Sequence, residues 1–187
     1  MALNGEQLKA LLERIDANLA APGVICLIGS GATLLLGQQA RQTDDLDVWA
    51  RASRMVMANL EDAAEAAGVS FDPKDELPSV PYIQVVHPGI VQVPGWNPET
   101  RQWLGEPERT VWAGKMLTVT VPPPSIIAAS KLLRGDDRDF EDCLWLMAAH
   151  AIDAEEISRA IKTLPREPRR RAAENLEMLS LLRPSRR

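Results

Sequence analysis

The sequence predicts an α/β (α+β) fold in which helices pack on a small mixed sheet and further helices follow toward the C-terminus. Two observations lead to this prediction. Apolar runs typical of strands alternate with segments of helical apolar spacing, and the residues after 124 hold helical patterns alone. The chain has 187 residues, enough to bury one sizeable core. We therefore expect a main domain over residues 1–150 and a helical extension over 151–187 that packs on it.

The N-terminal half is expected to alternate helices and strands. Asn4 and Gln7 form a capping pair before an amphipathic helix, and Ser53 is placed to cap a later helix that ends at Gly68. The apolar face of the first helix consists of Leu8, Leu11, Leu12, Ile15 and Leu19. The elements between the two helices are expected to be a strand over 24–28, a short helix over 31–37 and a strand over 45–50.

A loop is predicted over residues 69–81, because this segment contains three prolines. The strands expected after it are 82–86, 90–94, 109–113 and 117–121, with an irregular segment over 95–108. The helices expected to finish the chain are 124–133, 137–149, 153–163 and 167–182.

One segment carries most of the chemical information. An apolar run leads into Gly29 and Ser30, and a second apolar run carries Asp45 and Asp47, separated by one residue. Because successive side chains of a strand alternate between its faces, the two carboxylates are expected on one face. Two neighbouring carboxylates repel each other unless a cation lies between them. Magnesium (or manganese) is the natural candidate, since it takes one or two carboxylates together with substrate phosphates.

Gly29 and Ser30 are predicted to lie where a strand passes into a helix. Glycine lets the backbone approach a ligand closely, and the serine adds a hydroxyl and free N–H groups suited to a phosphate. Two plainer accounts stay open at this point. The Gly-Ser pair also fits a simple strand-to-helix turn, and the two acids fit solvated charges on an edge strand.

The combined pattern resembles the nucleotidyltransferases of the polymerase-beta-like superfamily. It reads Ile28-Gly29-Ser30, a spacer, then Asp45-Leu46-Asp47-Val48, and the spacer holds Gly37, Arg41 and Thr43. This finer pattern is similar to small bacterial nucleotidyltransferase-like proteins related to abortive-infection and toxin–antitoxin enzymes. The resemblance implies a nucleotidyltransferase-like fold and transfer of a nucleoside monophosphate from an NTP to an acceptor hydroxyl, on RNA or on a protein. It also permits an antitoxin partner.

The resemblance assigns roles to six residues. Asp45 and Asp47 would be catalytic and would hold the metal, Mg (or Mn). The nucleotide would be bound by Gly29, Ser30, Arg41 and Lys131.

Lys131 lies in a second matching segment, in which a lysine helix precedes Arg138-Asp139-x-x-Asp142. A second account of these residues is equally ordinary. Lys131, Arg134 and Arg138 would then neutralise the acids of the same two helices on exposed faces. Trp49 falls on the strand face of the two aspartates, where packing and base stacking are both open to it.

The resemblance also implies a third acid on a later strand, and here the sequence departs from the pattern. The outward position of the expected strand over 90–94 is Gln92, which cannot supply a charge or take up a proton. Either another acid substitutes, with Asp72, Asp75 and Asp139 as candidates, or the chain is a catalytically silent nucleotide-binding or protein-interaction module of the same fold.

Composition argues against a generally basic nucleic-acid binder, since the net charge is −5. From Arg166 to Arg187, however, seven arginines stand against three glutamates, a local +4. Cys26 and Cys143 are expected to be small core residues rather than a disulfide or metal site. The sequence shows no signal peptide and no apolar run long enough to span a membrane, so we expect a cytoplasmic protein without membrane contact.

Overall fold

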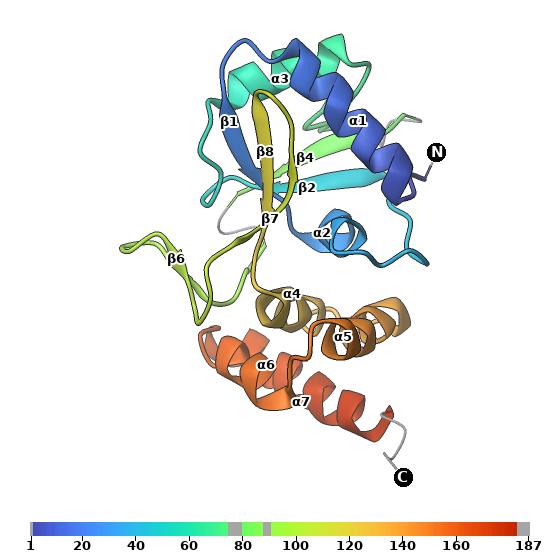
Figure 1. The fold of residues 1–187 in the computed structure, drawn as a ribbon. Coiled ribbons are helices and arrows are strands. Elements are labelled where there is room, and N and C mark those ends of the chain that lie inside the picture. Colours follow the sequence, from blue (N-terminus) through green and yellow to red (C-terminus); the bar gives the residue numbers. More distant parts are fainter. Residues whose placement is uncertain (1, 75–79, 88–90, 183–187) are drawn as a thin grey trace. The chain divides into compact units, whose positions relative to one another are not determined.

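The computed structural model describes residues 2–74, 80–87 and 91–182. It confirms the predicted mixed α/β class, with helices and small sheets along the chain (Figure 1). The chain divides into two compact units. Unit 1 comprises residues 1–91 and 108–122, and unit 2 comprises residues 92–107 and 123–187.

Unit 1 contains two three-stranded sheets. The first has the order β1-β8-β7, with β1 (Gly23–Cys26) parallel and β7 (Arg109–Ala113) antiparallel to the central β8 (Leu117–Val121). The second has the order β2-β4-β3 and is entirely parallel. Its strands are β2 (Asp45–Trp49), β4 (Tyr82–Val86) and β3 (Ser70–Phe71). The predicted strands 82–86, 109–113 and 117–121 are therefore confirmed.

Three helices belong to unit 1. They are α1 (Gly5–Asn18), α2 (Gly29–Leu35) and α3 (Met57–Ala66). The predicted capping box of α1 is confirmed, since Asn4 and Gln7 exchange side-chain to backbone hydrogen bonds of 3.0 Å. Helices α1 and α3 lie side by side (Figure 1), and the buried leucines of α1 contribute to the core.

The two sheets of unit 1 are joined where β1 ends. Leu27 forms an isolated antiparallel bridge with Val48 of β2. The next residue, Ile28, donates its N–H to the carbonyl oxygen of Asp47 at 2.9 Å. Because α2 begins at Gly29, this joint fixes the start of the helix against β2.

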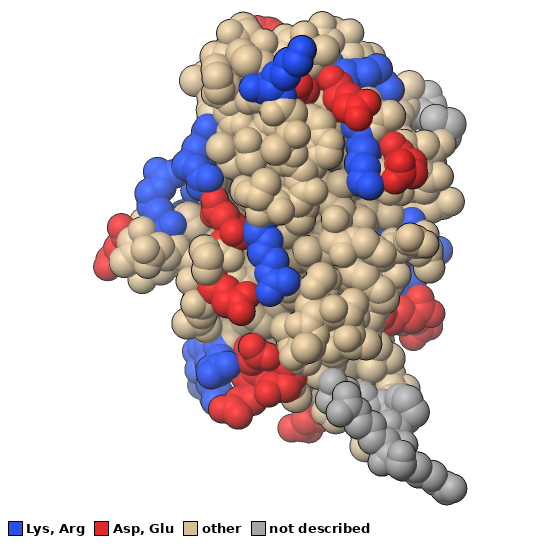
Figure 2. Space-filling view, viewed as in Figure 1, with Lys and Arg blue, Asp and Glu red and all other residues tan. Residues whose placement is uncertain are grey.

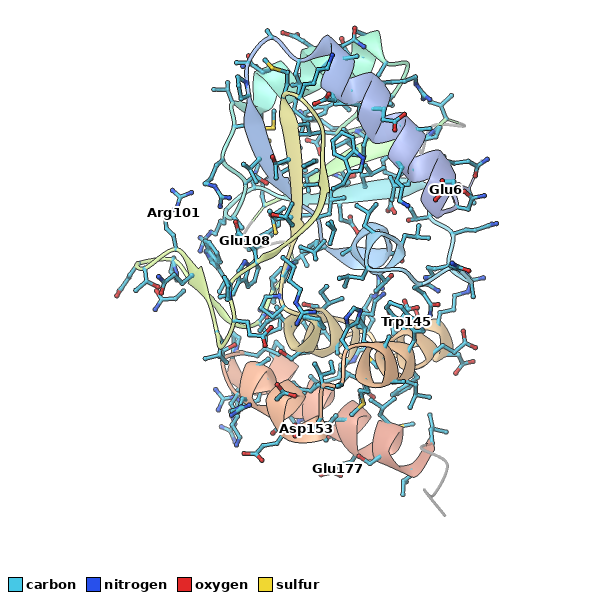
Figure 3. All side chains as sticks on the ribbon, viewed as in Figure 1. Glu6, Arg101, Glu108, Trp145, Asp153 and Glu177 are labelled. Carbon is cyan, nitrogen blue, oxygen red and sulfur yellow. The ribbon has the colours of Figure 1, made fainter. Side chains whose placement is uncertain are left out.

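Unit 2 combines a short hairpin with four helices. The hairpin pairs β5 (Trp96–Asn97) with β6 (Gln102–Trp103), and its two tryptophan rings lie 4.8 Å apart. Asp153, labelled in Figure 3, is the N-cap residue of α6 (Ala154–Ile161) and forms a capping box with Glu156. The helices are α4 (Pro124–Lys131), α5 (Asp137–Ala149), α6 (Ala154–Ile161) and α7 (Arg166–Leu182).

Three local predictions were wrong. Ser53 does not cap α3, because its hydroxyl is used inside the fold, accepting from Cys26 N–H at 3.0 Å and donating to the Trp49 carbonyl at 2.9 Å. The predicted loop 69–81 was wrong at Ser70 and Phe71, which form β3 and pair with β4. The predicted strand 90–94 is absent over its described residues 91–94, since the chain turns at Pro94 and at Gly95, where φ is +72°.

Arginines of α7 form ion pairs and hydrogen bonds with neighbouring groups of the same chain. Arg170 pairs with Glu167 and Glu174 on the same helix, and Arg169 donates to the Leu164 carbonyl at 2.8 Å. Over the face of the molecule shown in Figure 2, basic and acidic side chains are interspersed. The helix therefore matches a solvated, internally paired surface.

Both cysteines are free and fully buried, as predicted, and burial raises the pKa of each thiol to about 12.

Among the described residues, no helix combines the length and the apolar composition that a bilayer crossing requires.

Asp16 ties α1 to the turn between β7 and β8. Its carboxylate accepts backbone N–H bonds from Lys115 at 3.0 Å, Met116 at 2.7 Å and Leu117 at 2.6 Å. Burial alone would raise the pKa of Asp16, but these three donors outweigh it, and the pKa is lowered from its ordinary value.

Replacing Asp16 by Asn is expected to lower the free energy of unfolding by about 1–3 kcal/mol, because buried N–H groups lose a charged acceptor. Because the pKa of Asp16 is lower in the folded than in the unfolded state, its ionised carboxylate stabilises the fold at pH values above the unfolded pKa of about 3.9. This stabilisation is lost as the pH falls through the folded-state pKa. Urea titrations should therefore show the deficit at pH 7 and a smaller one in acid. Glu13→Gln, at an exposed position of the same helix, is the control; an equal effect of the two variants would contradict this role.

Candidate active site

Asp45 and Asp47 lie on one face of β2, as their spacing predicted. Both are half-buried, whereas Leu46 and Val48 on the opposite face are 0% exposed. The alternation gives each carboxylate access to solvent while the apolar neighbours anchor the strand in the core. Trp49 shares the face of the aspartates but is 3% exposed, so it packs into the core.

Each oxygen of Asp45 has a hydroxyl beside it. Thr43 donates to Oδ1 at 2.7 Å and Tyr82 donates to Oδ2 at 3.4 Å. Tyr82 stands directly opposite Asp45 in the parallel register of β2 and β4. Burial, and next the Asp45 carboxylate, raise the pKa of Tyr82, so its hydroxyl stays protonated and remains a donor. These two bonds fix the orientation of the carboxylate.

Gly29 lies against the carboxylate of Asp47. Its φ is +66°, a conformation that favours glycine. A Cβ at this position would overlap Oδ2 of Asp47 and stand 3.2 Å from its Cγ. Glycine is therefore required twice, by its backbone angle and by the space that the aspartate occupies.

Ser30 and Arg41 meet at the first turn of α2. The Arg41 guanidinium donates through Nη2 to the Ser30 hydroxyl at 3.2 Å. Both side chains are half-buried. The loop before β2 therefore places a fixed positive charge at the first turn of α2, beside the glycine that contacts Asp47.

The strand beside β2 is β4, and the residue opposite Asp47 is Gln84. The Gln84 amide donates from Nε2 to Oδ1 of Asp72 at 2.6 Å, and Asp72 follows directly after β3. The expectation that Gln92 takes an outward position on a strand was wrong. Gln92 is exposed and lies outside every described strand.

The three acids proposed as a substitute third carboxylate differ in what the structure shows of their location. Of the two candidates that the structure describes, Asp72 lies beside β4, in the same sheet as β2. Asp139 is 0% exposed in unit 2, where Arg134 binds it through two bonds of 2.8 and 3.0 Å. Asp75 lies outside the described residues.

Lys131 is buried among acids. It is 3% exposed, and its ammonium lies 2.6 Å from Oδ2 of Asp142 and 3.6 Å from Oδ1 of Asp139. Two charges that leave water together need such pairing. The acids of α5 therefore neutralise Lys131, but in a buried cluster rather than on an exposed face. Its nucleotide-binding role stays a prediction that these contacts do not favour.

The pair on β2 has the chemistry of a magnesium site. Hard divalent cations prefer carboxylate oxygens, and magnesium commonly uses one or two of them beside substrate phosphates and water. Each Asp45 oxygen accepts one hydroxyl and keeps further lone pairs. Because Gly29 has no Cβ, the Asp47 carboxylate can lie directly against the backbone at the start of α2. Within the described ranges, no group of three or more His, Cys, Asp or Glu side chains is placed to hold a metal.

Sequence reasoning missed Tyr82 and Gln84 as parts of the site. For Gln84 the sequence did hold a signal, because it is the one strongly polar residue in the otherwise apolar strand from Tyr82 to Val86. What the sequence did not show is that this strand pairs with β2, a contact between residues far apart in the chain.

Gly29→Ala is expected to destabilise unit 1 by more than the conformational cost of about 1–2 kcal/mol for an alanine in the left-handed region, because the Asp47 carboxylate must also move. Gly68→Ala is the matched control, since Gly68 has φ +73° with nothing within 4 Å of a Cβ. Denaturant titration of both variants measures the difference, and equal losses would mean that the contact with Asp47 costs nothing.

Lys131→Met should lower the free energy of unfolding by about 3–5 kcal/mol, because it removes the buried ammonium from the ion pairs that it forms with Asp139 and Asp142. Lys162→Met, at an exposed position, should change it little. Thermal and urea unfolding provide the measurement. A Lys131→Met variant of unchanged stability that had lost nucleotide binding would instead support the ligand role.

Comparison with known proteins identifies a family. A family model described as "Nucleotidyltransferase of unknown function (DUF6036)" matches residues 6–178, most of the chain. No curated protein and no solved structure matches this chain. The matched range includes every residue discussed above as part of the site.

Proposed function

Because the chain belongs to the DUF6036 family of nucleotidyltransferases, we propose that it is a magnesium-dependent enzyme that moves a nucleoside monophosphate from an NTP to an acceptor hydroxyl. One observation carries the metal dependence: two half-buried carboxylates share a face of β2, with the backbone of Gly29 packed against one of them. A site of this kind binds a metal–triphosphate better than a metal alone.

Asp45 and Asp47 are the catalytic residues of this proposal and hold the metal. Magnesium (or manganese), when bound, neutralises phosphate charge and lowers the proton affinity of the acceptor hydroxyl. Thr43 and Tyr82 keep Asp45 in a fixed orientation before substrate arrives. Catalysis then consists mainly of positioning and charge neutralisation by groups that need not rearrange.

The triphosphate is assigned to Gly29, Ser30 and Arg41. Gly29 lets its backbone lie against Asp47, and the Ser30 hydroxyl and the Arg41 guanidinium supply donors to the phosphates. Arg41 already contacts Ser30, so the positive charge is in place at the start of α2. Lys131 is left out of the assignment, because its ammonium is occupied by Asp142.

The acceptor is proposed only as a hydroxyl of RNA or of a protein. A toxin–antitoxin context, with a partner protein that restrains the enzyme, rests on the similarity of the spacer and on no contact described above. Growth arrest on expression, relieved by a neighbouring gene product, is the observation that would support it.

A second function is favoured by Gln84. A neutral amide beside Asp47 cannot act as a base, so the same geometry also suits a module that binds nucleotide without transferring it. The two functions differ in the fate of the nucleotide and not in its binding.

Asp45→Asn and Asp47→Asn are each expected to weaken magnesium-dependent NTP binding at least tenfold, because each removes one of about two charged metal ligands. Isothermal titration calorimetry with each NTP and Mg²⁺ measures this. Asp62→Asn carries the same charge change at an exposed position of α3 and should bind like the wild type. Unchanged affinity in both site variants would contradict the assignment.

The same proteins, incubated with labelled NTPs and total RNA or cell extract, separate the two functions. Label transfer by the wild type and Asp62→Asn, lost in Asp45→Asn, identifies the enzyme. Tight binding without transfer identifies the silent module.

A further inference from the structure

Three polar side chains stand in one row across the β2-β4-β3 sheet. Asp47 is in register with Gln84, and Phe71 is in register with Ile83, which places Asp72 beside Gln84 on the other side. Parallel neighbours in register point to the same face of a sheet. The row therefore runs from Asp47 through Gln84 to Asp72. On β4 the residues flanking Gln84 are buried, whereas Gln84 itself is half-buried.

Asp72 is held firmly in this row. Its backbone N–H donates to the Ile83 carbonyl at 2.7 Å, and its Oδ1 accepts from Val85 N–H at 3.2 Å as well as from Gln84 Nε2 at 2.6 Å. Its φ of +43° lies in the left-handed region, which aspartate tolerates better than most residues. Asp72 is thus fixed against β4 by its own backbone N–H and by the Val85 N–H that donates to its carboxylate.

The contact decides which way the Gln84 amide faces. A carboxylate accepts and does not donate, so the Gln84 nitrogen and not its oxygen must face Asp72. The amide is planar, and its oxygen therefore points away from β3. Within the residues that the structure describes, the Gln84 side chain bonds through this nitrogen, and β2 with Asp47 lies on its other side.

We propose that Gln84 supplies a neutral oxygen ligand to the metal site of Asp45 and Asp47, and that Asp72 is the positioning residue that turns this oxygen toward it. The inference rests on the proposed function. The Gln84 amide oxygen would be a neutral ligand, so all the negative charge that the protein contributes to the metal site would come from Asp45 and Asp47. A neutral oxygen is an acceptable ligand for magnesium or manganese.

Binding of Mn²⁺, followed by electron paramagnetic resonance, tests the proposal without any acceptor substrate. Gln84→Leu and Asp72→Asn should each weaken Mn²⁺ binding by about tenfold, the effect typical of lost support around a metal. The double variant should bind no more weakly than Gln84→Leu alone, because Asp72 acts through the glutamine. Gln92→Leu, the same change at an exposed glutamine, should match the wild type. Thermal melting confirms that each variant is folded.

Each outcome gives a decision. If Asp45→Asn abolishes Mn²⁺ binding while Gln84→Leu matches the wild type, Gln84 is not a ligand and the proposed function still stands. If Asp72→Asn weakens binding as much in the Gln84→Leu background as alone, Asp72 acts independently and the positioning role is overturned. If the wild-type protein binds no Mn²⁺ either alone or together with an NTP, both this inference and the proposed metal dependence fall. Should Asp72→Asn not fold, Gln84→Leu alone decides the ligand role.

Discussion

The candidate site depends on one backbone hydrogen bond, from the Ile28 N–H to the carbonyl oxygen of Asp47 at 2.9 Å. This bond joins the end of β1 to the middle of β2 and so sets where α2 begins. Gly29 is then forced so close to Asp47 that no side chain fits between them. The carboxylate, the helix start and the Ser30–Arg41 contact are consequences of that single joint. Polar groups from segments far apart in the chain are thereby held on one surface.

Much of unit 1 was predictable, because local rules decide it. The alternation along β2 put both aspartates on one face, and the Asn4–Gln7 box marked the start of α1. The neighbours of β2 were not predictable in this way. Strand β3 has two residues within a proline-rich segment, and its pairing with β4 is a tertiary contact without a local signal. For the same reason a glutamine was sought on the wrong strand, and Gln84 was overlooked.

Lys131 shows the other limit of sequence reasoning. The pattern of a lysine followed by several acids fits a phosphate ligand and an internal ion pair equally well. Burial separates them, since an ammonium that is 3% exposed and 2.6 Å from Asp142 is already neutralised. Arg41 carries the same kind of charge but is half-buried beside Ser30. Side-chain type alone does not distinguish these two positions, and the packing around them does.

The most direct test is a crystal structure of the protein grown with Mn²⁺ and a non-hydrolysable NTP, with data collected at the manganese absorption edge. The account predicts an anomalous peak at the site of Asp45 and Asp47, with the triphosphate near Gly29 and Ser30. Nucleotide bound elsewhere, or the two carboxylates turned onto a permanent basic partner with no metal between them, would contradict it.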